Sequence, residues 1–448
     1  MRILIIGAGN AGCQLARRLS EDRHNVVMVD RNIDALRRAE TGLDILTVCG
    51  PGASPRILDE VEVDKSDLVI AVTDSDEVNI TACLFAHAAG VPRTVARVSD
   101  PDFMRHNDAY DLQAMGISLV INQKQECARE IASMLEMPGA REVFRLFDDR
   151  LMVAGLPVHT TNPLLGHSPV DCGRPDLIDG IRLLAIRREG GLIVPHGDTV
   201  FKPNDFVYLV GSPPAVSAVL DWMRPDIRPF EKVIIAGGGD IGLLLARMLE
   251  NRLPCVVLEK DDEQARRCSA ELDKTLVLCA DALSESTLDE AGMTGNCAFV
   301  ALTGDDENNI MNCLMAQKNG AGITIAQITR PDYMPVLQQL GLVDRIVNPY
   351  LSMTRGILHY LRSQHIQAAS LLHNLPGELL DVTIAAESRA VGAFLRDLKL
   401  PRAAIVAAVL RNGDILTATG DLKFAPGDRV LIFVHPDAVK KIESLFLK

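Results

Sequence analysis

Continuous apolar runs alternate with segments of helical apolar spacing throughout residues 1–121. Such runs are typical of parallel strands that are buried on both faces. This β-α alternation predicts a doubly wound parallel sheet with right-handed crossovers. The expected strands lie at 2–6, 25–29, 44–48, 67–72, 93–98 and 117–121, and the expected helices at 10–21, 32–41, 54–60 and 76–89.

The pattern of apolar and polar residues changes after this first lobe. Helical spacing continues over 122–135, and Pro138-Gly139 ends it, so we expect a connector helix. Short β-rich runs punctuated by Gly, Pro and Asp follow up to about residue 220, which predicts a small α+β module with hairpins. A Pro-bearing stretch at 224–229 disfavours regular structure and marks the boundary between the halves.

The second half repeats this plan. The run 3–12 returns at 233–242, an offset of 230 residues, and the small module returns at an offset of 223. The fold class is therefore two Rossmann-like lobes, each followed by a small α+β domain. The expected boundaries are 1–121 (first lobe), 122–140 (connector), 141–225 (small domain), 230–348 (second lobe), 349–367 (connector) and 368–448 (small domain).

Each lobe opens with a strand, a G-x-G-x-x-G loop and a helix. In that context glycines permit a tight turn and close approach of a pyrophosphate, and the helix N-terminus attracts anions. Asp30 stands eighteen residues after Gly12, where a carboxylate accepts hydrogen bonds from both ribose hydroxyls and favours NAD(H) over NADP(H). The first loop comprises Gly7, Ala8, Gly9, Asn10, Ala11 and Gly12.

Glu259 ends the equivalent strand of the second lobe and can play the part of Asp30. A companion residue differs: Arg97, a candidate phosphate partner at the end of the fifth strand, is matched by Gln327. Arg330 lies three residues further on. We therefore expect a weaker or different ligand in the second lobe, whose loop comprises Gly237, Gly238, Gly239, Asp240, Ile241 and Gly242.

The fourth strand of each lobe is followed by a mostly polar segment, Thr73-Asp74-Ser75-Asp76 in the first and Thr303-Gly304-Asp305-Asp306 in the second. The candidate site residues in them are Thr73, Asp74, Thr303 and Gly304. Helix capping is one interpretation of these segments, and a place in the ligand crevice is compatible with it. No nucleophile or base partner converges with the carboxylates in sequence, so we expect no catalytic residue.

Composition excludes several function classes. The net charge of −13 argues against a nucleic-acid partner, which requires concentrated positive charge. No apolar run reaches the roughly 18–20 residues of a membrane helix, and the chain enters a strand directly after Met1, so we expect a cytoplasmic protein without a signal peptide. The ten cysteines and ten histidines show no metal-ligand spacing. We expect mostly buried, reduced thiols and no metal.

Together these features resemble the TrkA family, regulatory subunits of bacterial Trk potassium uptake systems with two tandem RCK domains. The resemblance covers essentially the whole chain, through residues 2–12, 26–30, 71–79, 96–98 and both small modules. It implies binding of NAD(H), with ATP or ADP as an open alternative, at the residues named above. It also implies a homotetrameric ring at the inner face of the cell membrane, acting on a potassium-translocating subunit of the TrkH or TrkG type.

The chain departs from the family pattern at two segments, and two other functions are compatible with the sequence. Many family members carry Gly-Asp after the third strand, whereas this chain has Gly50-Pro51-Gly52 and Ala280-Asp281-Ala282, which leaves the adenine contacts open. An NAD-dependent dehydrogenase would share the glycine loop and Asp30, but the regions after each lobe are small for a catalytic domain. A stand-alone nucleotide sensor without a membrane partner is the third interpretation.

Overall fold

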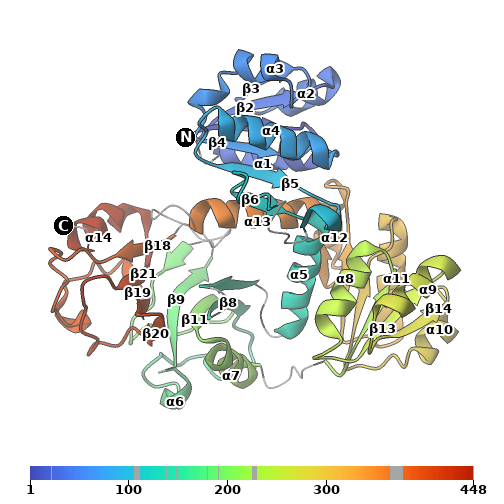
Figure 1. The fold of residues 1–448 in the computed structure, drawn as a ribbon. Coiled ribbons are helices and arrows are strands. Elements are labelled where there is room, and N and C mark those ends of the chain that lie inside the picture. The colour runs from blue at the N-terminus through green and yellow to red at the C-terminus, as the bar shows by residue number, and fades with distance from the viewer. Residues whose placement is uncertain are drawn as a thin grey trace. The chain divides into compact units, whose positions relative to one another are not determined.

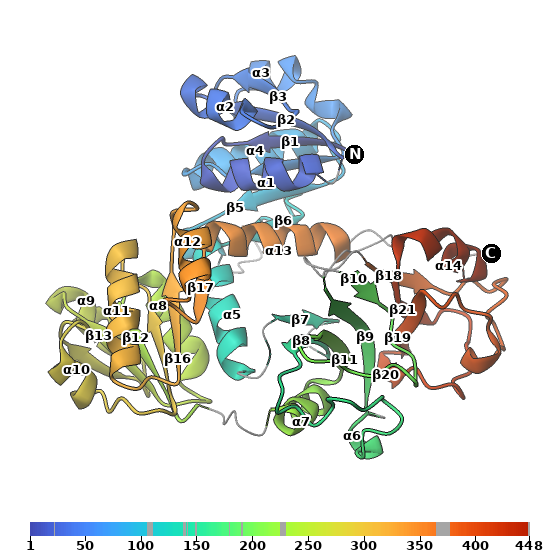
Figure 2. The same cartoon turned by 180° about the vertical axis from the view of Figure 1, so that it is seen from behind.

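The protein is described from a computed structural model, which covers residues 1–446 except 22, 105–110, 138–139, 141, 148–149, 179, 190, 225–229 and 364–376. The expected helix stop at 138–139 and the boundary at 225–229 lie outside the described residues. The chain forms two compact units, and each unit takes parts from both halves (Figures 1 and 2). One unit contains Met1–Ala132 and Phe230–Tyr360, and the other contains Ser133–Pro229 and Leu361–Lys448.

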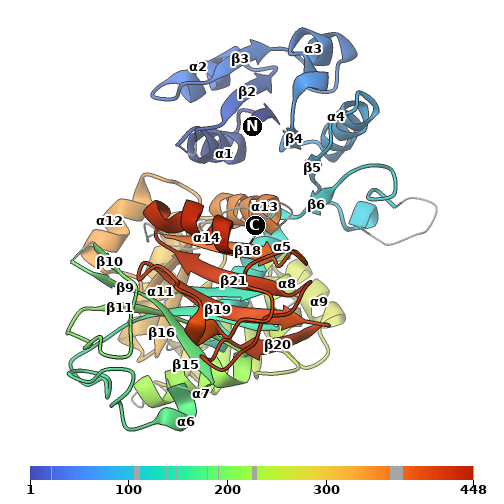
Figure 3. The ribbon, with the colours of Figure 1, turned by 90° about the vertical axis from the view of Figure 1, so that its left-hand side faces the viewer.

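The first lobe is a six-stranded parallel sheet in the order β3-β2-β1-β4-β5-β6. Helices α1 and α2 cover one face, and α3 and α4 cover the other (Figure 3). Its strands are β1 (Arg2–Ile6), β2 (Asn25–Asp30), β3 (Leu46–Cys49), β4 (Leu68–Ala71), β5 (Thr94–Arg97) and β6 (Leu119–Ile121). Its helices are α1 (Asn10–Glu21), α2 (Ile33–Glu40), α3 (Pro55–Glu60) and α4 (Asp76–Ala88), with 3₁₀ turns at Val63–Lys65 and Pro101–Met104.

Burial explains why these strands form. Residues 3–6 of β1 are at most 1% exposed, and alternate side chains face opposite sides of the sheet. Leu4 and Ile6 belong to the apolar cluster that contains Ile57 and Leu58 of α3 and Cys83 of α4. A strand that is buried on both faces in this way reads as a continuous apolar run.

The second lobe repeats the sheet order as β14-β13-β12-β15-β16-β17, again parallel. Its strands are β12 (Lys232–Ala236), β13 (Cys255–Glu259), β14 (Leu276–Cys279), β15 (Cys297–Ala301), β16 (Ile323–Gln327) and β17 (Arg345–Val347). Its helices are α8 (Asp240–Leu249), α9 (Asp262–Glu271), α10 (Glu285–Glu290), α11 (Asp306–Lys318) and α12 (Tyr333–Leu340).

A connector helix follows each lobe: α5 (Gln123–Glu136) after the first and α13 (Pro349–Ser363) after the second. The two helices contact each other through a polar cluster. Glu130 of α5 pairs with Arg355 of α13 and accepts a 2.6 Å hydrogen bond from the Ser352 hydroxyl. The connectors therefore link the two halves within one unit.

The other unit holds two small antiparallel sheets, ordered β10-β9-β11-β8-β7 and β18-β21-β19-β20. One apolar cluster joins them, with Val153 and Tyr208 from the first and Leu379 and Phe433 from the second. Their strands are β7 (Glu142–Leu146), β8 (Leu151–Pro157), β9 (Ile181–Arg188), β10 (Gly191–Ile193), β11 (Phe206–Gly211), β18 (Glu378–Thr383), β19 (Ala404–Arg411), β20 (Asp414–Thr417) and β21 (Arg429–Val434). Helices α6 (Pro175–Ile178), α7 (Pro213–Met223) and α14 (Val439–Phe446) and 3₁₀ turns at Leu395–Asp397 and Pro436–Ala438 complete them.

The predicted fold class is confirmed in both halves: a doubly wound parallel sheet, then a small α+β domain. The expectation of buried thiols is confirmed for seven of the ten cysteines, while Cys13 is half-buried. It is wrong for Cys49 and Cys279, which are exposed. Both stand at the last position of the third strand, β3 or β14, where a sheet edge leaves the side chain uncovered. Within the described part of the chain, we find no helix of the length and apolarity that crossing a membrane demands.

Candidate functional site

Two of the three glycines in the first loop are required by packing alone. Gly7 has φ +112°, and a Cβ there would lie 3.0 Å from the Thr73 backbone nitrogen. A Cβ on Gly12 would lie only 1.8 Å from the Gly7 carbonyl oxygen. These glycines therefore let the loop turn against the end of β4 and let α1 start close to β1.

Packing does not explain why residue 9 is a glycine. A Cβ on Gly9 would meet no atom within 4 Å, and its φ lies outside the left-handed region. The folded chain by itself tolerates a side chain here, so the glycine keeps open a space beside the N-terminus of α1. A pyrophosphate that approaches the backbone would use this space, which is the fit that a dinucleotide requires. The loop continues into Asn10 and Ala11, the first two residues of α1, of which Asn10 is exposed and Ala11 buried.

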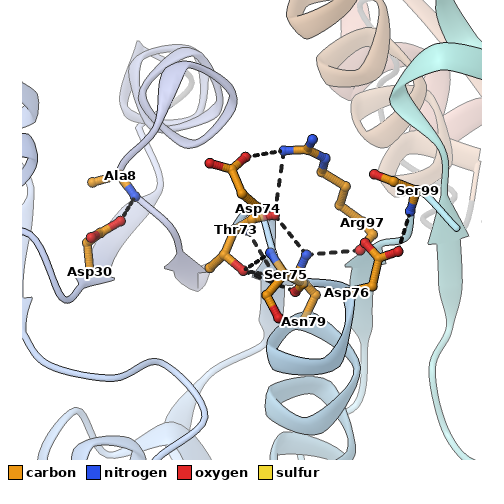
Figure 4. Close-up of polar contacts among 9 residues, drawn as sticks. All are labelled: Ala8, Asp30, Thr73, Asp74, Ser75, Asp76, Asn79, Arg97 and Ser99. Carbon is orange, nitrogen blue, oxygen red and sulfur yellow. Dashed lines mark hydrogen bonds and ion pairs between the residues drawn. The ribbon is translucent and has the colours of Figure 1, made fainter.

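Asp30 lies at the end of β2, beside this loop. Its Oδ2 accepts a 2.6 Å hydrogen bond from the Ala8 N–H (Figure 4). Its Oδ1 accepts a 2.8 Å bond from the Asn32 N–H. The two bonds fix the carboxylate at the loop. Each carboxylate oxygen retains a lone pair for a ribose hydroxyl, because an ionised carboxylate offers about four acceptor positions.

The second lobe reproduces this arrangement. Gly237 has φ +109°, and a Cβ on Gly242 would lie 2.0 Å from the Gly237 carbonyl oxygen, whereas a Cβ on Gly239 would meet nothing within 4 Å. The Glu259 carboxylate accepts hydrogen bonds from Gly238 N–H at 2.7 Å and from Asp261 N–H at 3.0 Å. The longer glutamate side chain thus takes the place of Asp30. Asp240 and Ile241 open α8, where their counterparts open α1.

Thr73 lies at the end of β4, next to the loop, and is held by Asn79 of α4. The Thr73 backbone N–H and hydroxyl both donate to Asn79 Oδ1, at 2.9 and 2.7 Å. Asn79 Nδ2 donates to the carbonyls of Thr73 and Arg97, at 3.0 and 2.9 Å. The buried amide therefore ties the ends of β4 and β5 together. In the second lobe Asn309 makes the same four bonds to Thr303 and Gln327.

The capping expected of the segments 73–76 and 303–306 is confirmed, and it falls to Ser75 and Asp305. The Ser75 hydroxyl caps α4 by accepting from Val78 N–H at 3.2 Å, and the Asp305 carboxylate caps α11 by accepting from Asn308 N–H at 2.7 Å. Thr73 and Asp74 are therefore not the capping residues. Gly304, the counterpart of Asp74, has open space around its Cβ position.

The Arg97 guanidinium lies at the same sheet edge, on the side of Thr73 away from Asp30 (Figure 4). Its Nη1 is 3.1 Å from Asp74 Oδ1, and the Arg97 side chain is 16% exposed against 100% for Asp74. Such a pair with a fully exposed carboxylate is weak, because water screens it. Arg97 can thus exchange Asp74 for a phosphate without leaving the sheet edge.

The second lobe has no matching cation at this position. Gln327 replaces Arg97 and is 9% exposed, and among the described atoms its Oε1 has no hydrogen-bond partner. Arg330 stacks on Tyr333, with its Cζ 4.4 Å from the ring centroid, and donates to the tyrosine hydroxyl at 2.8 Å. That hydroxyl in turn donates to Glu307. Arg330 is therefore held by its neighbours and does not stand in for Arg97.

Sequence reasoning missed the polar residues that build each sheet edge. Besides Asn79 and Asn309, Asp76 accepts from Ser99 N–H and Asp100 N–H, and Asp306 accepts from Thr329 N–H and Arg330 N–H, all at 2.8–3.1 Å. The repeat contained this information, since both pairs recur at the offset of 230. Their role as ties was not visible because their partners lie on other strands.

The segment after the third strand differs between the lobes as the sequence indicates. A Cβ on Gly52 would lie 2.1 Å from Ile6 Cγ2, so the first lobe requires glycine there for packing. In the second lobe Ala282 is accommodated and buried. The presence of Gly52 is therefore explained by packing and is no evidence for or against an adenine contact.

Comparisons with known proteins agree with this architecture. The family model of the TrkA-N domain matches residues 3–123 and 233–349, and that of the TrkA-C domain matches 153–224 and 379–447. Full-length relatives are the Trk system potassium uptake protein TrkA of Halomonas elongata, 31% identical over 100% of this chain and 98% of its own, and TrkA homolog 1 of Methanosarcina mazei, 30% identical over 100% of both.

Solved structures share the fold over the whole chain. The GsuK RCK domain has a TM-score of 0.60 and the GsuK channel bound to NAD has 0.61, each at 21% identity and over 100% of this chain. The likeness covers 95% and 79% of those chains, respectively. Both pairs of domain matches and the full-length relatives lead to one conclusion: this chain belongs to the TrkA family of Trk system potassium uptake proteins.

Proposed function

We propose that this protein is a cytoplasmic, nucleotide-sensing regulatory subunit that controls a membrane-embedded potassium-translocating partner. The observation that carries the proposal is the pair of loops in which packing requires the first and last glycines but not the middle one. Gly9 and Gly239 each leave space beside a helix N-terminus, and a carboxylate, Asp30 or Glu259, is fixed next to each. Support comes from full-length relatives named as potassium uptake proteins.

The ligand of the first site is NAD(H), held by this chain's own groups. The α1 N-terminus and the loop amides face the pyrophosphate, Asp30 accepts from the ribose hydroxyls, and Arg97 pairs with a phosphate. A 2′-phosphate would meet the Asp30 charge, which disfavours NADP(H). The second site binds NAD(H), ATP or ADP, with Glu259 in the part of Asp30.

Regulation requires that a nucleotide favours one arrangement of the lobes over another, because a ligand shifts an equilibrium only by its differential affinity for the two states. We infer that the chain works as a homotetramer, in which local changes at each site add up through symmetry. This movement changes the open probability of the membrane-embedded partner.

Calorimetric titration with NAD, NADH, ATP and ADP, side by side, tests the binding step. Potassium flux through the reconstituted partner, a TrkH- or TrkG-type subunit, tests the regulatory step. We expect saturable binding and a nucleotide-dependent change in flux. Turnover of NADH with a small substrate would favour a dehydrogenase, and binding without any change in flux would favour a stand-alone sensor.

A further inference from the structure

A lysine from the connector after the first lobe reaches the glycine loop of the second lobe. Lys124 of α5 places its Nζ 2.5 Å from Oδ2 of Asp240, the first residue of α8. Arg267 of α9 approaches the other carboxylate oxygen, with Nη1 3.4 Å from Oδ1. The two partners Lys124 and Asp240 are 116 residues apart in the chain.

Asp240 is unusual for an anion site. Its counterpart in the first lobe is the neutral Asn10. A carboxylate at a helix N-terminus suits the helix dipole, but its charge repels a phosphate that approaches the same helix end. The hydrogen bond from Lys124 lowers the pKa of Asp240, so the carboxylate is charged at neutral pH. The site therefore needs a cation before it can accept a phosphate.

The cation does not come from the sheet edge that supplies it in the first lobe. Gln327 replaces Arg97, and Arg330 is held by Tyr333 and Glu307. Arg267 is also bound at 3.0 Å to Glu271, one turn along its own helix. Lys124 is 43% exposed on a flexible four-carbon stem, so its ammonium can move from a carboxylate oxygen to a phosphate oxygen at the same helix end.

We propose that Lys124 is the phosphate cation of the second nucleotide site, held in place by Asp240 until a nucleotide binds. The inference rests on the proposed function and deepens it. A phosphate carries more charge than a carboxylate and competes for the lysine. A nucleotide in the second lobe therefore binds a side chain of α5, the helix that follows the first lobe. This contact couples the two halves of the chain even when the first site is empty.

The test uses the full chain with Gly9→Asp, which removes nucleotide binding at the first site. Calorimetry then measures binding at the second site alone. The probes are ADP and adenosine, which lacks phosphate. We expect Lys124→Met to weaken ADP binding by about tenfold or more and to leave adenosine binding unchanged. Lys124→Arg should keep most of the affinity, and Asp240→Asn should raise it, since a like charge is removed.

The double variant Lys124→Met/Asp240→Asn separates a phosphate contact from a structural ion pair. If Lys124 meets phosphate, the double variant binds ADP more weakly than Asp240→Asn alone. Equal affinities would show that the lysine serves only Asp240 and would overturn the inference. Lys318→Met is the matched control: it removes an exposed lysine at the opposite end of α11 from the site, about 18 Å along the helix, and should change nothing.

Failure of the inference and failure of the proposed function give different results. If the Gly9→Asp protein binds no ADP while the parent protein binds NADH, the inference falls and the first site stands. If the parent protein binds no nucleotide at all, the proposed function falls as well. Thermal unfolding of each variant checks that it is folded.

Discussion

The Asp30 carboxylate receives a 2.6 Å hydrogen bond from the backbone N–H of Ala8, so the end of β2 is tied to the glycine loop that follows β1. Glu259 and Gly238 form the same tie at 2.7 Å in the second lobe. An acidic residue at this position thus orders the loop before any ligand arrives. In the proposed function, this one side chain serves both ligand selection and loop geometry.

We expect Asp30→Ala to weaken NADH binding at the first site by about ten- to a hundredfold, since charge-assisted hydrogen bonds are worth roughly 1.5–3 kcal/mol. Asp30→Asn is the matched variant, because its amide oxygen can still accept from Ala8 N–H, although the bond from Asn32 N–H is lost. It should order the loop but lose affinity for the ribose hydroxyls. Calorimetry with NADH and NADPH measures both effects, and equal affinity of the parent protein for the two would contradict the assignment.

Substitutions of Gly9 and Gly12 should separate binding from folding. Gly9→Asp places its side chain in open space and should leave thermal stability unchanged while it abolishes most dinucleotide binding. Gly12→Ala forces a Cβ to within 1.8 Å of the Gly7 carbonyl and should lower the stability of the first lobe. Thermal unfolding and calorimetry on each variant check this.

The same substitution in the second lobe, Gly239→Asp, should remove a weaker or different ligand, because Gln327 supplies no cation at the sheet edge where Arg97 lies in the first lobe. Titration of Gly9→Asp and Gly239→Asp with NADH and ADP compares the two sites. Two identical and independent sites would be inconsistent with this expectation.

Asn79→Ala should destabilise the first lobe and disorder Thr73. The amide makes four hydrogen bonds while fully buried. Its loss removes the partner of the Thr73 N–H and of the Arg97 carbonyl, at a cost of about 1–3 kcal/mol for each group that stays buried and unpaired, whereas the Thr73 carbonyl keeps a 3.5 Å bond from Arg97 Nη1. Urea unfolding measures the cost. Ser75→Ala, which removes the cap of α4 and a hydrogen bond to the exposed Glu77, is the control and should cost about 1 kcal/mol.

The pair Arg411 and Asp428 should make the second small domain sensitive to acid. Burial by itself raises the pKa of Asp428, but hydrogen bonds from Arg411 and Ala425 N–H outweigh it and hold the pKa below its usual value. The stabilisation is therefore present above about pH 4 and is lost as the pH falls through the lower folded pKa.

Arg411→Met would leave Asp428, with 1% of its side chain exposed, as an unpaired buried charge, and should cost about 3–5 kcal/mol at pH 7. In the variant the cost should shrink as the pH is lowered and the carboxyl is protonated. Urea unfolding of both proteins between about pH 3 and pH 7 tests the sign. A cost that grows in acid would refute the argument.

Thiol labelling should distinguish the exposed from the buried cysteines. Burial raises the pKa of Cys83 and Cys255 to about 12, so these thiols should react slowly in the folded protein. Cys49 and Cys279 should react first, because both are exposed. Cys49 is the register partner of Asp30, so bound nucleotide should slow its labelling. Peptide mapping after brief alkylation, with and without NADH, measures both effects.

The sequence by itself determined the repeat, the class of both lobes and the carboxylates at the loops. These features depend on local chain properties: burial on both faces makes a strand uniformly apolar, and a tight turn before a helix requires glycine. The strand-end positions of Asp30 and Glu259 followed directly from these patterns. A second occurrence at a constant offset turned an ordinary glycine motif into evidence for a duplicated unit.

Only the tertiary structure decided which glycines serve packing and which leave room for a ligand, because that depends on atoms that approach from other strands. It also decided that Asn79 holds Thr73, and that Lys124 meets Asp240 across 116 residues. No local pattern encodes such contacts. They arise when the sheet order and the connector helices bring distant segments together, and the side chains then pair according to charge and burial.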